Sequence, residues 1–147
     1  MIATFLVPVK TRRGNKNSSR KIRLDKYKID WDGDSKSKFQ KRVKKYLKKY
    51  WENHFVYEEC KVVGTRLHFD FYNHTTGVVI ECQGKQHENY VPFFHGKGVA
   101  GRLQFLQQLK RDTYKIDFCD LNNILFVEIY EKDRLTKDLF GRQGVIL

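Results

Sequence analysis

The chain has 147 residues, a formal net charge of +12 and a mean hydropathy of −0.65. This length is enough for one compact domain with one hydrophobic core and too short for two domains of ordinary size. The sequence has no run of roughly 18 apolar residues, as a membrane helix requires, and its start lacks the basic and apolar regions of a signal peptide. We therefore expect a soluble, cytoplasmic protein.

The positive charge is concentrated in the first third of the chain. Residues 1–50 contain 17 Lys and Arg against 4 Asp and Glu, whereas residues 51–147 contain 12 against 13. A basic segment attached to a neutral body is typical of a protein that binds a polyanion, most often through its phosphates. The alternative on charge alone is a solubilising tail or a patch for anionic lipid.

Residues 10–28 mix basic side chains with Gly, Asn and Ser and show no apolar period. This composition predicts a mobile arm that becomes ordered on its partner. We place the arm at residues 1–34, ahead of a folded domain at residues 35–147. The arm residues expected to contact phosphates are Lys10, Arg12, Arg13, Lys16, Arg20, Lys21 and Arg23.

A helix is predicted from about Ser37 to Asn53. Apolar residues recur there at steps of three and four, from Phe39 to Trp51, and a serine at position 35 or 37 is suited to cap the first turn. The opposite side of this helix is basic, comprising Lys41, Arg42, Lys44, Lys45, Lys48 and Lys49. We expect phosphate contacts from Lys41, Lys44, Lys45 and Lys48.

The rest of the chain alternates strands and helices. Two strand-like segments, residues 66–72 and 77–83, are joined by a loop suited to a hairpin. A long helix is predicted over 102–121, a buried strand over 124–130 and a short helix over 135–140. This order predicts an α/β domain with a mixed sheet between helices. The side of the long helix expected to face the core consists of Leu103, Leu106, Leu109, Thr113 and Ile116.

The three cysteines, Cys60, Cys82 and Cys119, are odd in number and widely spaced. The sequence contains no CxxC or HxxxH pattern, so it encodes neither a disulfide framework nor a zinc site. We expect reduced cysteines that lie mostly in the core.

Two carboxylates interrupt the apolar runs of the predicted hairpin. If the turn is centred between Thr75 and Thr76, Asp70 lies directly across from Glu81. Cross-strand partners have Cβ atoms about 4.5–5.5 Å apart, and like charges at that separation are destabilising unless they are neutralised. Mg²⁺ neutralises such a pair, because it prefers one or two carboxylates together with waters and phosphate oxygens. The alternative is an exposed pair on a solvated sheet face.

Gln83, Lys85 and His87 follow Glu81 at steps of two, so a continuing strand would place them on the same side as the cation. Cleavage of a phosphodiester requires deprotonation of a water, stabilisation of charge on the phosphate and protonation of the leaving oxygen. We assign the phosphate contact to Lys85 and the base to His87. The alternative for His87 is an ordinary polar residue near a strand end.

Four strings of the sequence resemble one nuclease family in order and spacing: residues 69–72, 79–87, 110–112 and 122–129. They resemble the very-short-patch-repair-like nucleases of the PD-(D/E)xK superfamily, in particular the EDxHD homing endonucleases of phages. The resemblance spans about residues 35–130. It implies a restriction-endonuclease-like core, Mg²⁺-dependent hydrolysis of DNA, and metal ligation by Asp70 and Glu81. It also implies catalytic roles for His87 and Asp112.

Two positions depart from the family pattern. The superfamily's lysine, two residues after the second carboxylate, is Gln83 here, which can orient water or metal but cannot abstract a proton. On the first helix, where many relatives carry a glutamate, this chain has Gln40, either as its native residue or as an inactivating substitution. One carboxylate fewer favours one-metal chemistry.

We therefore expect an endonuclease that uses Mg²⁺, or Mn²⁺ in its place, to nick or cleave double-stranded DNA as a monomer or weak homodimer. Its expected setting is a bacterial or phage-infected cell. His95, in a loop rich in glycine and aromatic residues, is expected either to contact DNA or to pack within the loop. The alternatives are a structure-selective nuclease similar to a junction resolvase and a non-catalytic DNA-binding protein on a decayed nuclease scaffold. An RNA-binding module is a weaker alternative, because no aromatic RNP-like string is present.

Overall fold

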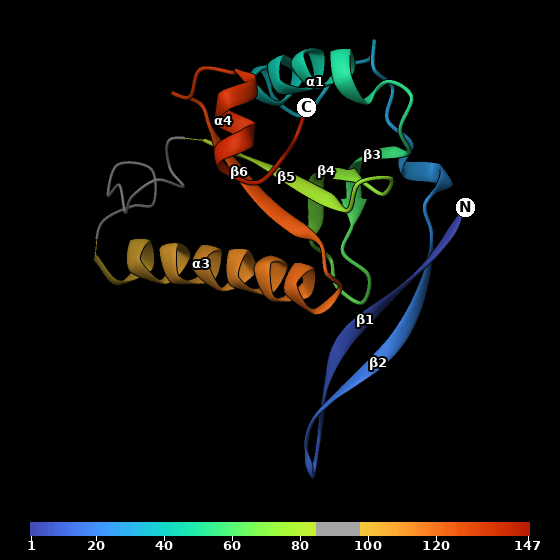
Figure 1. Cartoon of the computed structure of the whole chain (residues 1–147). Helices are drawn as coiled ribbons and strands as arrows, with labels where there is room; N and C mark the ends of the chain where they lie inside the picture. The colour runs from blue at the N-terminus through green and yellow to red at the C-terminus, as the bar shows by residue number, and fades with distance from the viewer. Residues whose placement is uncertain (85–97) are drawn as a thin grey trace.

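The computed structural model describes residues 1–84 and 98–147 (Figure 1). Its strands and helices follow the chain in this order: β1 (Ile2–Thr11), β2 (Gly14–Arg23), the 3-10 helix η1 (Asp25–Tyr27), α1 (Lys38–Trp51), β3 (Val56–Lys61), β4 (His68–Asn73), β5 (Val78–Gln83), α3 (Gly98–Leu121), β6 (Leu125–Tyr130) and α4 (Lys137–Arg142). The predicted helices and the hairpin of β4 and β5 are confirmed, with ends that differ by a few residues.

A four-stranded sheet forms the centre of the molecule. Its strand order is β3-β4-β5-β6, with antiparallel neighbours except for the parallel pair β5 and β6. Parallel neighbours need a crossover connection, and α3 lies in that connection. Figure 1 shows α3 on one side of the sheet and α1 and α4 on the other. The prediction of an α/β fold with a mixed sheet between helices is therefore confirmed.

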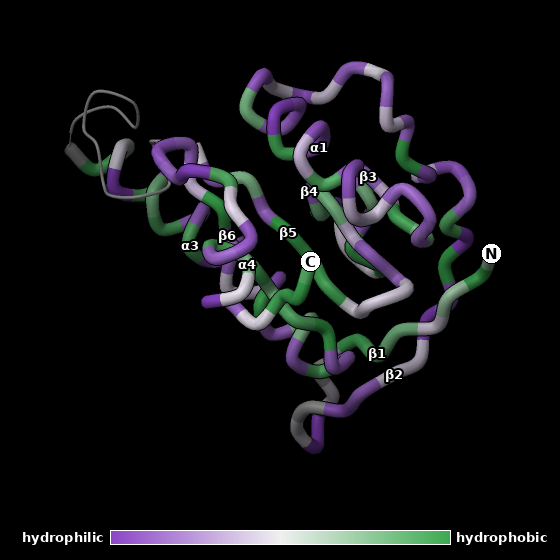
Figure 2. Tube along the Cα trace, turned by 45° about the horizontal axis from the view of Figure 1, so that its top comes forward, coloured by the Kyte–Doolittle hydropathy of each residue, from purple (hydrophilic) through white to green (hydrophobic). Residues whose placement is uncertain are grey.

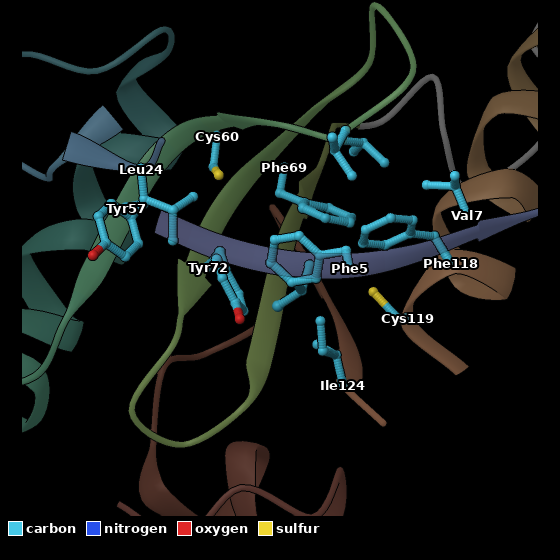
Figure 3. Close-up of a cluster of buried hydrophobic side chains, with 14 residues drawn as sticks. Phe5, Val7, Leu24, Tyr57, Cys60, Phe69, Tyr72, Phe118, Cys119 and Ile124 are labelled. Atoms are coloured by element: carbon cyan, nitrogen blue, oxygen red, sulfur yellow. The ribbon is translucent and has the colours of Figure 1, made fainter. Parts of the chain in front are cut away.

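Two hydrophobic clusters fill the two sides of the sheet. On the side of α1 and α4, the apolar face of α1 packs against buried residues of β5 and β6, such as Ile80 and Ile129. The helix begins where the sequence predicts, because the Ser37 hydroxyl accepts a hydrogen bond from the backbone N–H of Gln40. On the side of α3, a cluster rich in aromatic residues joins the sheet to β1 (Figure 3).

The predicted mobile arm is instead a β-hairpin of β1 and β2. Ala3, Phe5 and Val7 alternate along β1 and are buried, with the ring of Phe5 lying between those of Tyr72 and Phe118 (Figure 3). Figure 2 shows the contrast between the mainly hydrophobic β1 and its more hydrophilic partner β2. The prediction of an irregular segment over residues 10–28 is wrong because β2 is an exposed edge strand, which needs no apolar period.

The middle of β1 is also fixed by a side chain from the far end of the chain. The Asn122 carbonyl oxygen accepts from the backbone N–H of Leu6 at 2.7 Å, and its amide donates to the Leu6 carbonyl at 2.9 Å. This pair of hydrogen bonds imitates a neighbouring strand. The hairpin is therefore docked on the body of the protein at residues 3–7, while its turn extends away.

The face of α3 expected to be buried is the wrong one. Leu103, Leu106, Leu109 and Ile116 are exposed, Leu106 at 58%, and Thr113 is exposed as well. The helix buries Phe118 and Cys119 instead, near its C-terminal end. None of the helices in the described ranges is long and apolar enough to cross a membrane.

Candidate active site

The hairpin of β4 and β5 has the predicted register. Phe71 pairs with Ile80, so the turn is centred between Thr75 and Thr76, and the same register places Asp70 opposite Glu81. The regular backbone pairing ends at this point. Side chains replace it, since the Asp70 carboxylate accepts from the backbone N–H of Cys82 at 2.7 Å and the Glu81 carboxylate faces the backbone N–H of Asp70 at 3.4 Å. The two carboxylates thus lie side by side where the strands separate.

Both carboxylates are buried: Asp70 is 9% exposed and Glu81 4%. A lysine from α3 neutralises part of this charge, because Nζ of Lys115 lies 2.6 Å from Oε1 of Glu81. Burial and the charge of Asp70 nevertheless raise the pKa of Glu81 well above its ordinary value, with Lys115 acting in the opposite direction. Two buried acids with one ammonium group leave a site that favours a further cation.

The two carboxylates open onto a cavity of about 430 Å³ between the sheet, the start of α1 and the middle of α3. Most of the predicted catalytic residues line it together: Gln40, Asp70, Glu81, Gln83 and Asp112. The sequence placed these residues on four separate elements, and the fold brings them to one place. Lys85 and His87 from the same prediction, and His95 of the predicted DNA contacts, lie outside the described residues.

The donor set of this cavity fits a hard divalent cation with few protein ligands. In residues 1–84 and 98–147, no group of three or more His, Cys, Asp or Glu is arranged to hold a metal. Asp70 and Glu81 are the two adjacent carboxylates that could hold such a cation, with its other positions left to water or to phosphate oxygens. This arrangement is the one that Mg²⁺ favours, and it differs from the four-ligand cage of a structural zinc site.

Gln40 is held by two carboxylates behind the site. Its Nε2 donates to Oε2 of Glu58 and to Oε1 of Glu59, both at 3.0 Å. Nζ of Lys44 donates to the other oxygen of Glu58, also at 3.0 Å. Glu59 has a φ of 51°, which is uncommon for a residue other than glycine. An amide suits position 40 because a glutamate there would face these two carboxylates. Lys44 neutralises charge on Glu58.

Gln83, two residues after Glu81, faces the neighbouring strand. Its amide faces Oε1 of Glu128 on the neighbouring strand at 3.4 Å, and the Tyr130 hydroxyl donates to Oε2 of Glu128 at 3.0 Å. These contacts keep the side chain of Gln83 on the face of the sheet that also carries Glu81. The amide can orient a bound water or phosphate but cannot take a proton.

The cation that the sequence reasoning missed is Lys115. It belongs to the same helix face as Asp112, three residues earlier, and both line the cavity. The signal was present in the string from Arg111 to Lys115, in which an acid and a base recur at helical spacing. The partner of Lys115 could not be predicted from the sequence, because Glu81 is 34 positions away.

The predicted phosphate-binding residues separate into three groups. Lys45 on α1 is exposed. The described basic side chains of the hairpin are exposed as well: Arg12, Arg13, Lys16, Arg20, Lys21 and Arg23. The side chain of Lys10 is not described. Lys41 and Lys48 pair with Asp34 and Asp32, at 2.7 and 2.9 Å.

Lys44 does not belong to the exposed basic face of α1, as the sequence analysis expected. It is only 1% exposed, because it is turned inward to Glu58. The predicted position of Lys44 on the exposed face of the helix is therefore wrong.

The chain is similar to two iridovirus proteins. It is 39% identical over 66 residues to the uncharacterized protein 094L of frog virus 3 (isolate Goorha), a match that covers 45% of this chain and 41% of that protein. It is 32% identical over 68 residues to the uncharacterized protein 033L of invertebrate iridescent virus 3, covering 46% of this chain and 33% of that protein. The matched segment is therefore less than half of either relative. These relatives come from iridoviruses and not from phages, in contrast to the expected setting in a bacterial or phage-infected cell.

No protein-family model and no solved structure matches the chain.

Proposed function

We propose that this protein is a Mg²⁺-dependent endonuclease that hydrolyses phosphodiester bonds in double-stranded DNA. The observation that carries the proposal is the pair of buried carboxylates, Asp70 and Glu81, beside Lys115 in a cavity open to solvent. Burying like charges together costs free energy, so such a pair is retained where a cation and a reaction use it. The proposal includes the restriction-endonuclease-like core, an intracellular setting and the PD-(D/E)xK family.

The residues of the cavity divide the chemistry among them. Asp70 and Glu81 would hold the cation, which supplies neutralisation of charge on the phosphate when it is bound. Lys115 donates to Glu81 and lies close enough to the same cavity to contact a phosphate oxygen or to hold the attacking water. Gln83 orients a bound water or phosphate, and Asp112 lies on the helix face beside Lys115. His87 is the proposed proton acceptor.

The exposed basic side chains of the hairpin bind DNA phosphates without sequence specificity. Removing residues 1–34 would also remove Phe5 and Leu24 from the core, so truncation is a poor test. The triple variant Arg12→Gln, Arg13→Gln, Lys16→Gln removes charge at the turn alone. For this variant the slope of log K of DNA binding against log salt should fall in magnitude by up to roughly three, one for each lost phosphate contact. An unchanged slope would exclude the turn from DNA binding.

The experiment that tests the catalytic proposal is nicking of supercoiled plasmid in Mg²⁺ by wild type, Asp70→Asn and Glu81→Gln. Glu52→Gln, at an exposed acid after α1, is the matched control. We expect each site variant to lose activity by about 100-fold or more, since charge neutralisation by a cation is worth several kcal/mol. The control should cut like wild type. DNA binding in EDTA should change little in any of them.

The outcomes separate the alternatives. Equal nicking by wild type and both site variants would refute the proposal. DNA binding without nicking in Mg²⁺ or Mn²⁺ would indicate the non-catalytic scaffold. Preference for a four-way junction over linear duplex would indicate the structure-selective nuclease.

A further inference from the structure

A second cavity adjoins the candidate active site on the side of the β3–β4 loop. It has a volume of about 640 Å³ and lies between that loop and α3. Four residues line both cavities: Lys36, Asp70, Asp112 and Lys115. The two hollows therefore meet at Asp70 and form one continuous groove, which we call the α3 groove.

Charges in the α3 groove are sorted by depth. Of the three acids of the second cavity, Asp70 is buried and Glu59 and Asp112 are half-buried, whereas Lys36, Arg66 and Arg111 line the same cavity and are exposed. A phosphate backbone is suited to this arrangement, because its charges would meet the exposed cations while one phosphate approaches the buried acids through a cation. A cationic ligand would not be suited to it, since the exposed cations would repel it.

The wall formed by α3 is a stripe of hydrogen-bonding side chains. Gln104, Gln108, Arg111 and Lys115 recur at helical steps of four, three and four, and all of them line the second cavity. From Gln104 to Lys115 the helix rises about 16 Å. A stripe of this length can contact more than one phosphate of a DNA strand.

We infer that one strand of the DNA lies along the α3 groove, with phosphates on one side of the cleaved bond bound by Lys36, Arg66 and Arg111. The inference rests on the proposed function, since it uses Asp70 and Glu81 as the point of cleavage. It adds residues that the sequence analysis did not assign to DNA. It also assigns a direction, because the groove extends from the carboxylates toward the β3–β4 loop.

The test is the salt dependence of binding of the full chain to a 30-base-pair duplex in EDTA, by fluorescence anisotropy. The double variant Arg66→Ala, Arg111→Ala is compared with Arg134→Ala, Arg142→Ala, which removes the same charge from exposed residues that line neither cavity. The groove variant should bind at least about tenfold more weakly than the control pair. The slope of log K against log salt should fall by roughly two, one per phosphate contact.

Equal slopes and affinities for the two double variants would overturn the inference. Circular dichroism of both variants shows whether either has lost its fold, and Arg66→Lys, Arg111→Lys keeps the charge and should recover most of the slope. Failure of the proposed function is distinguishable from failure of the inference. Absence of nicking with a reduced slope would leave a DNA-binding groove, whereas nicking with an unchanged slope would place the substrate elsewhere.

Discussion

Replacing Lys115 by methionine should destabilise the protein because it leaves two carboxylates buried together without their ammonium partner. The pair of Lys115 and Glu81 has an N···O distance of 2.6 Å, and the lysine side chain is 15% exposed. Removing one partner of a buried ion pair costs about 3–5 kcal/mol. Because solvent reaches Lys115 in part, we expect the lower value, about 3 kcal/mol. A domain of this size loses about 2–4 °C of Tm per kcal/mol, so Tm should fall by about 6–12 °C.

The assay is thermal and urea unfolding at pH 7, with two comparison variants. Lys110→Met changes an exposed lysine on the same helix and should alter the free energy of unfolding by no more than about 0.5 kcal/mol. The double variant Lys115→Met, Glu81→Gln removes both charges and should regain most of the loss, because no unpaired buried charge remains. Added MgCl₂ should stabilise Lys115→Met more than the double variant.

Two results would refute this reasoning. One is a Lys115→Met protein as stable as Lys110→Met, which would mean that the contact contributes nothing at neutral pH. The other is a double variant no more stable than Lys115→Met. In that case the loss would come from packing of the lysine stem and not from the charge left on Glu81.

Four further outcomes follow from the structure. The pKa of Glu81 is raised above its ordinary value of 4.5, so the folded protein keeps this proton to a higher pH than the unfolded chain does. The free energy of unfolding should therefore fall as the pH rises from 4.5 through the raised pKa, and it should fall less in Glu81→Gln. Parallel pH profiles for the two proteins in urea unfolding would contradict this. Phe5→Ala should cost about 3–5 kcal/mol in the same assay, while Leu6→Ala, at an exposed position, should cost far less; similar losses would mean that the hairpin is not docked. Gln40→Glu should destabilise the protein more than Gln40→Met, because it adds a third carboxylate to Glu58 and Glu59, and a more stable glutamate variant without added metal would argue against the observed hydrogen bonds. The buried Cys60 and Cys119 should resist a thiol reagent at pH 8 until urea is added, since burial raises the pKa of both thiols, whereas Cys82 is half-buried and lines the cavity; rapid native labelling of Cys60 or Cys119 would show that the core opens.

Local patterns in the sequence were sufficient for the elements that carry most of the site. The apolar steps of α1 and the Ser37 cap lie within one helix, and the register of β4 and β5 depends on a four-residue turn. Asp70 and Glu81 could therefore be paired by counting residues. Asp112 entered through the family resemblance, and the structure places it at the same cavity.

The errors arose where a residue's partner lies far along the chain. Lys44 reads as one more exposed lysine of α1, and only the fold brings Glu58 to it. The apolar stripe of α3 reads as a core face, yet Phe118 and Cys119 make the contact with the sheet. β2 lacks alternation because it is an exposed edge strand, although its Ile22 packs partly against the core. Its strand character is imposed by pairing, which a window of neighbouring residues does not contain.

The pair of hydrogen bonds between Leu6 and Asn122 limits when the hairpin can dock during synthesis. The two residues are 116 positions apart, and the ring of Phe5 likewise needs Phe118. At about 5–20 residues per second, roughly 6–23 s pass between synthesis of the two halves of this contact. The basic hairpin therefore leaves the ribosome long before the part of its docking site that α3 supplies exists. Docking of residues 3–7 can be completed only after residue 122 has been made, and a nascent chain stalled before residue 118 would present the basic hairpin undocked.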